Sequence, residues 1–195
     1  MKHLMTLVLT LLTLGTLQAQ DNVGSYIFPK GILAAHYVYV GTKGNDIDEM
    51  RSRIIYIQNG GRVKFQKTEL YEGSASSYIK RNFSISDSII YLESQTGGAH
   101  DYNFGSNNIY VKLPPASKII KWETNEGGTL YRCSAKREKR QYDGKLVDAI
   151  IIERLPVENN KEMPDFKTKM IFIYGVGLYQ EIMTATNKIL YRLET

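Results

Sequence analysis

Apolar and polar residues alternate with a period of two along most of this chain. The segment 188–194, KILYRLE, places Ile, Tyr and Leu on one side and Lys, Arg and Glu on the other. Such alternation is typical of a strand with one buried face. Related patterns predict further strands at 32–40, 53–58, 62–67, 77–83, 88–94, 108–113, 118–123, 130–140, 145–155, 167–174 and 178–183. The only helical turn we expect is at Asn45–Met50.

Short turn signals join several of these segments. Asn59–Gly61 (NGG), Tyr142–Lys145 (YDGK) and Thr186–Lys188 (TNK) each separate two strand-like runs. Asn-Gly and Asp-Gly tolerate the positive φ angles of tight hairpins, and such hairpins join adjacent antiparallel strands. A meander of about a dozen strands must curl, split or close. The sequence therefore predicts an all-β fold, an antiparallel meander of hairpins forming a curved half-barrel, barrel or sandwich.

Two glycines interrupt the apolar run IFIYGVGLYQEI near the C-terminus. A dinucleotide-binding loop requires a third glycine and a following helix. Here Gln180 occupies the third position after Gly175 and Gly177, and the following residues alternate as a strand. We therefore interpret the pair as a turn, bulge or corner of the sheet rather than as a phosphate-binding loop.

The N-terminal residues have the pattern of a secretory signal peptide. Lys2 precedes an apolar run from Leu4 to Leu17, and small and polar residues follow up to Ala19. The run is shorter than the roughly 20 residues of a membrane-spanning helix. We expect residues 1–19 to be removed, which leaves a single antiparallel β domain at 20–195, exported to the periplasm or secreted, with no transmembrane anchor.

The composition limits the classes of binding partner and the redox chemistry that we expect. Removal of Lys2 lowers the formal net charge from +5 to +4, which is too small an excess to indicate nucleic acid. Cys133 is the only cysteine, so no internal disulfide can form. Because it lies within the strand-like LYRCSA, we interpret it as a buried small apolar residue.

Sequence motifs for catalysis, cofactors or metals are missing. The histidines that follow the signal peptide, His36 and His100, lie far apart, whereas metal sites usually include at least one close pair of ligands. Asp46 and Asp48 have only the first alternation of a calcium loop, because Met50 takes the third place. We therefore expect no catalytic residue, metal or cofactor. A hydrolase with carboxylates on neighbouring strands, such as Glu153 and Glu181, stays a minor alternative.

The most distinctive polar feature is the basic segment, KREKR at Lys136–Arg140. Strand alternation would place Lys136, Glu138 and Arg140 on one face and Arg137 and Lys139 on the other. The segment could bind phosphate or sulfate groups of envelope lipids or glycans through Lys136, Arg137, Lys139 and Arg140. Alternatively, the charges keep an exposed strand edge from pairing with other molecules, and we favour this reading.

Tyrosine is abundant, with 14 copies, and could line a binding groove or complete a core. The candidate ligand-binding residues are Tyr37 and Tyr39, which alternate in one strand, and Tyr174 and Tyr179, which flank the glycine pair. Core filling is the more common use of such residues.

The signal peptide, the run of hairpins and the late YGVGL strand at Tyr174–Leu178 together suggest a resemblance. The chain resembles exported β-rich proteins of Gram-negative bacteria and, more distantly, is similar in architecture to curved-sheet lipoprotein carriers. That resemblance implies an acyl or other amphipathic ligand held on a concave sheet. The lipidated cysteine of many such carriers is missing here.

These observations favour a non-enzymatic exported protein that binds an apolar or amphipathic ligand or an envelope component. The partner would be a lipid, another amphipathic small molecule or an envelope protein. The alternative is a structural or interaction module with a filled core, which acts through exposed edges and the basic segment.

Overall fold

The computed structural model describes residues 23–27, 34–43, 46–59, 64–71, 78–86, 88–97 and 100–193. The predicted signal peptide lies outside these residues. Strands dominate this part of the chain, and the helical turn α2 (Gly24–Ile27) precedes them. No described helix has the length and apolar character needed to span a membrane.

The strands follow one another along the chain with short connections. The first half contains β1 (Ala34–Lys43), β2 (Asp46–Asn59), β3 (Lys64–Tyr71), β4 (Tyr78–Ser86), β5 (Ile89–Thr96), β6 (Tyr102–Asn103) and β7 (Ile109–Lys112). The second half contains β8 (Ile120–Glu126), β9 (Thr129–Tyr142), β10 (Lys145–Glu158), β11 (Lys161–Glu162), β12 (Thr168–Ile173), β13 (Gly177–Met183) and β14 (Lys188–Leu193). Two short 3-10 turns lie at Gly105–Asn107 and Pro164–Phe166. Every strand expected from alternation is confirmed.

The predicted helical turn at Asn45–Met50 is wrong. Asp46–Met50 is the start of β2, and its backbone pairs with β1 from Lys43 back to Tyr39. The cross-strand ladder with β1 overrides any local preference for a helix, because each residue gains a partner only in the extended conformation.

The predicted hairpins are present in the sheet. Asp143 and Gly144 have φ angles of 48° and 69°, as the tight turn between β9 and β10 requires. Asn187 has φ 54° in the turn between β13 and β14. Strands β2 and β3 pair as predicted, whereas Gly60 and Gly61 lie outside the described residues.

The glycine pair forms the turn between β12 and β13, as predicted. Gly175 has φ 76° and Gly177 has φ 93°, values that favour glycine. The amide of Gly175 donates to the Ser25 carbonyl at 2.7 Å, so this N–H anchors α2.

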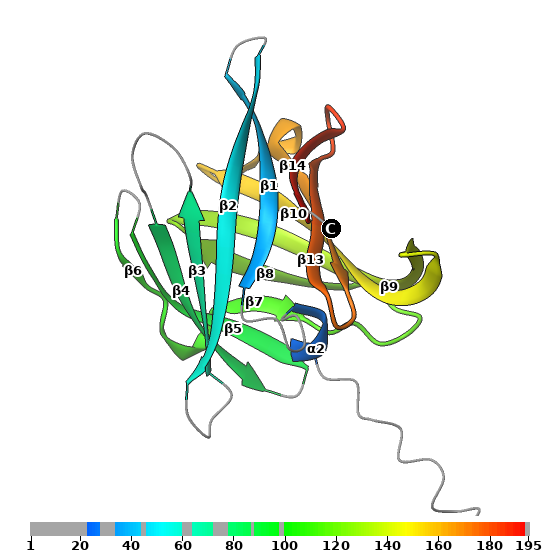
Figure 1. Ribbon diagram of the computed structural model, residues 1–195. Coiled ribbons are helices and arrows are strands. Elements are labelled where there is room, and N and C mark those ends of the chain that lie inside the picture. The colour runs from blue at the N-terminus through cyan, green and yellow to red at the C-terminus, as the bar shows by residue number, and fades with distance from the viewer. Residues whose placement is uncertain are drawn as a thin grey trace, which may run out of the picture.

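All described strands belong to one antiparallel sheet that curls without closing into a barrel (Figure 1). The order is β6-β5-β4-β3-β2-β1-β14-β13-β12-β10-β9-β8, with β7 also on β5 and β11 also on β10. Most neighbours in the sheet are neighbours in the sequence, which is the predicted meander. The pairing of β1 with β14 joins the two ends of this meander.

The curl brings the two halves of the sheet together around an apolar core. Phe83 of β4 and Leu92 of β5 belong to the same buried cluster as Trp122, Ile150 and Phe172 of the second half. The helical turn α2 adds Val23, Tyr26 and Ile27 to this cluster. Side chains from both halves therefore fill the described part of the concave side.

Side chains bridge the two ends of the sheet where backbone pairing stops. The Glu126 carboxylate, at the end of β8, accepts from Arg81 of β4 at 2.8 Å and from Arg154 of β10 at 2.5 Å. The adjacent turn packs on Tyr102 so closely that a Cβ at Gly128 would lie 3.2 Å from its ring. The sheet is thus held in its curl by side-chain contacts at this seam.

Candidate functional site

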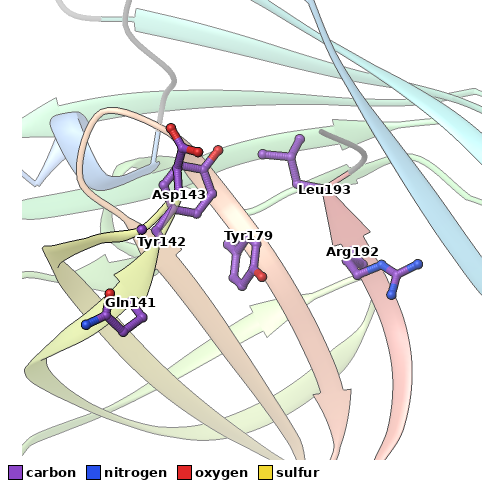
Figure 2. Close-up of a pocket in the computed structure, with 7 residues that line it drawn as sticks. Gln141, Tyr142, Asp143, Tyr179, Arg192 and Leu193 are labelled. Atoms are coloured by element: carbon purple, nitrogen blue, oxygen red, sulfur yellow. The ribbon is translucent and has the colours of Figure 1, made fainter.

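A cleft of about 730 Å³ lies between the tip of the β9–β10 hairpin and the strands β13 and β14 (Figure 2). We call it the hairpin cleft. Its described lining residues are Gln141, Tyr142, Asp143, Gly144, Tyr179, Arg192 and Leu193. A volume of this size falls within the range of about 300–1,000 Å³ typical of small-molecule sites.

A tight turn and a β-bulge direct the tyrosines of the hairpin cleft toward each other. The tight Asp143–Gly144 turn fixes the end of β9 at Tyr142. In β13 the register skips Tyr179, because Ile171 pairs with Gln180 and Phe172 with Leu178. Tyr179 is therefore the extra residue of a bulge, a device that re-aims a side chain.

The tyrosine rings form the aromatic part of the hairpin cleft. The rings of Tyr142 and Tyr179 meet edge to face with centroids 5.5 Å apart. Figure 2 shows Tyr179 between the Tyr142–Asp143 turn on one side and Arg192 and Leu193 of β14 on the other. Both rings are half-buried, so they retain surface for contact with a ligand.

The polar residues of the hairpin cleft lie at its rim. Gln141, Asp143 and Arg192 are all exposed to solvent. They supply an amide, a carboxylate and a guanidinium, which can together donate and accept hydrogen bonds. Aromatic faces beside such groups suit a ligand that has both apolar and polar surfaces.

The four tyrosines predicted to bind a ligand do not meet at one site. Tyr179 lines the hairpin cleft, whereas Tyr174 packs edge to face on Tyr26 at 5.1 Å, beside the core. The backbone of Tyr37 on β1 pairs with Leu193, a residue of the hairpin cleft, and that of Tyr39 with Tyr191. The side chains of Tyr37 and Tyr39 lie outside the described part of the structure.

Three of the four cations of the basic segment pair with carboxylates of their own hairpin. Lys136 and Arg140 both bind the Glu138 carboxylate, and Lys139 binds Asp148 at 2.8 Å. Burial alone would raise the pKa of Glu138, but the hydrogen bonds from Lys136 and Arg140 lower it. The alternation predicted for Lys136, Glu138 and Arg140 is thus confirmed.

Arg137 differs from the other cations of the basic segment in that it contacts an aromatic ring. Its guanidinium lies over the ring of Tyr26, 5.6 Å from the centroid, against α2. The four basic residues proposed to bind an anion are therefore divided between the two faces of β9. This arrangement fits the expected role of the charges in protecting the strand better than a single anion site.

A second group of polar residues lies in the interior, around Arg154. Its guanidinium lies over the Tyr131 ring at 4.1 Å as well as on Glu126. Burial opposes the charge on Arg154, but Glu126 and other nearby groups raise its pKa. Arg81 donates from Nε to Gln95, which is also buried, at 3.0 Å. Because these charges bind one another across the seam, we interpret the group as structural.

The carboxylates considered for a hydrolase do not converge. Glu153 binds Lys167 at 2.8 Å and lies next to the inward-facing Ile152, so it points outward. Glu181 pairs with Met170, which belongs to the core. The two carboxylates therefore lie on opposite faces of the sheet. Within the described ranges, no three histidine, cysteine or acidic side chains gather as metal ligands.

Sequence reasoning named Tyr179 as a candidate but did not name the residues that line the hairpin cleft with it. Tyr142 was identified only as the first residue of a turn, and Arg192 only as part of the polar face of the last strand. The order of strands in the sheet brings these residues together. The one available signal was an aromatic residue directly before Asp-Gly.

Comparisons with known proteins match this chain to no family model, no curated protein and no solved structure.

Proposed function

We propose that this chain is a non-enzymatic, exported binding protein that holds a small amphipathic ligand in the hairpin cleft. The observation that supports this function is the pair of half-buried tyrosine rings in a cleft of about 730 Å³, with Arg192, Asp143 and Gln141 at its rim. An apolar part of the ligand would lie on the rings, and a polar or charged part would reach the rim.

The hairpin cleft lies in a different part of the sheet from the ligand site implied by the resemblance to curved-sheet carriers. Such carriers hold the ligand on the concave face, but here the described concave side is filled by residues such as Phe83, Trp122 and Phe172. The hairpin cleft lies at the end of a long hairpin instead. We therefore expect a ligand that fits at the surface, with only its apolar part covered.

The first experiment is native mass spectrometry of the mature protein, purified gently from the extracytoplasmic fraction of its own host. We expect a stoichiometric small molecule that denaturing extraction releases and identifies. The fluorescent amphipathic anion 1-anilinonaphthalene-8-sulfonate supplies a second readout. Its affinity should fall about tenfold in Tyr179→Ala, since one aromatic contact contributes about 0.5–1.5 kcal/mol beyond its buried area.

A matched control tests whether the cleft itself is responsible. Tyr174→Ala removes a tyrosine from the same β12–β13 region, but one that packs on Tyr26 rather than in the hairpin cleft. It should bind the dye as the unmodified protein does, provided that it keeps its fold by circular dichroism. A bare protein in native spectra, together with equal dye binding by Tyr179→Ala, would refute the proposal.

A further inference from the structure

A second pocket, of about 490 Å³, lies at the other end of the β9–β10 hairpin from the hairpin cleft. We call it the loop pocket, because the segment 159–167 after β10 contributes to its wall. The hairpin cleft includes Gly144, which precedes β10, whereas the loop pocket includes Glu158, the last residue of β10. A strand of 14 residues is roughly 45 Å long. The two pockets are therefore separate sites.

The loop pocket forms because the segment 159–167 folds back along β10. Asn159 and Asn160 have φ angles of 49° and 61°, as a tight turn requires, and β11 then pairs with the end of β10. The Met163 amide donates to the Pro156 carbonyl of β10 at 2.9 Å, and a 3-10 turn follows directly. These contacts hold the loop beside the last residues of β10.

Apolar side chains make up most of the described lining of the loop pocket. They are Tyr131, Pro156, Val157, Met163 and Phe166. The Arg154 guanidinium on the Tyr131 ring is already paired with Glu126. Phe166 is 54% exposed, which is unusual for a large apolar side chain in this structure. A ligand that covers the Phe166 ring would remove apolar surface from water, and this burial favours binding.

Glu158 is the only charged side chain among the described residues of the loop pocket. It is exposed, and it takes part in no ion pair within the part of the chain that the structure describes. Lys161 is its cross-strand neighbour, but the two side chains form no ion pair. Asp165, next to Phe166, is a second exposed carboxylate without an ion pair among these residues. The carboxylate of Glu158 is therefore available to a positively charged ligand.

We propose that the loop pocket binds an amphipathic organic cation, a small molecule that joins an apolar body to an ammonium group. The volume of the pocket falls within the range of small-molecule sites. The apolar body would lie against Val157, Met163 and the Phe166 ring, and the ammonium group would meet the Glu158 carboxylate. Aromatic rings favour such a ligand further, because their faces attract positive charge. This site does not depend on the function proposed for the hairpin cleft.

The fluorescent amine dansylcadaverine is the probe, because it joins an aromatic body to a primary ammonium group. Its fluorescence should report saturable binding to the purified full chain that weakens as salt increases. Glu158→Gln removes the charge at nearly constant shape and should weaken binding by about fivefold, the upper end for accessible ion pairs. Asp165→Asn removes the same charge from a residue that does not line the pocket, so it should change the affinity by less than about twofold.

Phe166→Ala tests the apolar wall of the loop pocket and should weaken dansylcadaverine binding by about tenfold. Tyr179→Ala, which alters the hairpin cleft, should leave the binding of this amine unchanged. Dansylglycine has the same rings but carries a carboxylate in place of the ammonium group. It should show no binding that Phe166→Ala weakens, because its charge would be repelled by Glu158.

Circular dichroism and thermal unfolding establish that each variant is folded, and Phe166→Leu, which removes only the ring, replaces Phe166→Ala if the latter unfolds. No saturable binding of dansylcadaverine, or equal binding by Glu158→Gln and Asp165→Asn, overturns the proposal. Binding of dansylglycine that depends on Phe166 would show a site without selectivity for cations, and so also overturns it. Loss of amine binding in Tyr179→Ala but not in Phe166→Ala would mean that the amine occupies the hairpin cleft instead.

Discussion

At the scale of single residues, Cys133 shows how position in the sheet determines chemistry. It is 4% exposed and pairs with Trp122 on one side and Arg154 on the other. Burial raises the pKa of its thiol to about 11, although Arg154 acts in the opposite direction. The predicted burial of this cysteine is confirmed, and at neutral pH it is a thiol, which is the unreactive form.

We expect Cys133 to resist alkylation in the native protein. Iodoacetamide at pH 8 should label it only on the timescale of unfolding, because both burial and the raised pKa keep the thiolate population low. Intact-mass spectrometry with and without urea measures the label. Rapid stoichiometric labelling without urea would show that the sheet around β9 opens locally in the native state and exposes Cys133.

At the scale of elements, the β9–β10 hairpin combines a tight turn, a buried stretch and a compensated charged face. Ile150–Ile152 is buried on both faces of the sheet. On the outer face, Glu138 lies between Lys136 and Arg140 and binds both. The hairpin can therefore extend past the core without a block of uncompensated positive charge.

The stability contributed by Glu138 should depend on pH. Its pKa is lower in the folded state than its ordinary value of 4.5, so its contribution is complete above pH 4.5 and is lost as the pH falls through the folded pKa. Glu138→Gln should cost about 0.2–1 kcal/mol at pH 7, the usual contribution of accessible ion pairs. Urea unfolding at pH 7 and near pH 3 measures this difference.

As the pH falls below 4.5 the stabilities of the two proteins should converge, because the ion pairs are lost as Glu138 becomes protonated. Asp143→Asn is a suitable control, because that exposed turn residue takes part in no ion pair among the described residues, and its substitution should change the free energy of unfolding little at either pH. A difference for Glu138→Gln that is the same at both pH values would mean that packing, rather than charge, accounts for it.

The sequence predicted elements well because their signals are local. Alternation identified strands such as 188–194, and Asp143–Gly144 identified its turn, since positive φ angles restrict the residues that fit. The error at Asn45–Met50 arose because pairing with β1 decides that segment's conformation. The hairpin cleft could not be predicted, because it depends on strand order and on the bulge at Tyr179, neither of which leaves a periodic signal.

At the scale of the whole molecule, the sheet curls until its ends meet, but side chains rather than strands join them. Arg81, Glu126 and Arg154 connect β4, β8 and β10 through one carboxylate. Asn108 makes the corresponding connection between β5 and β8. Such a closure keeps the core covered where, among the described residues, β7 and β8 are not joined by a backbone ladder.

Glu126 is the residue on which this closure should depend most. Its side chain is 12% exposed, and those of Arg81 and Arg154 are each 11% exposed, so all three charges are largely removed from water. Glu126→Gln leaves both guanidinium groups without that carboxylate. Removal of one partner from a buried ion pair costs about 3–5 kcal/mol, and we expect a loss of this size in urea unfolding.

Arg81→Met is the informative comparison, because it leaves Glu126 and Arg154 as a balanced pair. It should cost clearly less than Glu126→Gln, and hydrogen exchange in Glu126–Thr129 should accelerate in Glu126→Gln more than in Arg81→Met. If both variants lose less than about 1 kcal/mol, then apolar packing around Trp122 and Phe83 suffices to keep the sheet curled. The charged group would in that case determine only how the β8–β9 turn is positioned against β4 and β5.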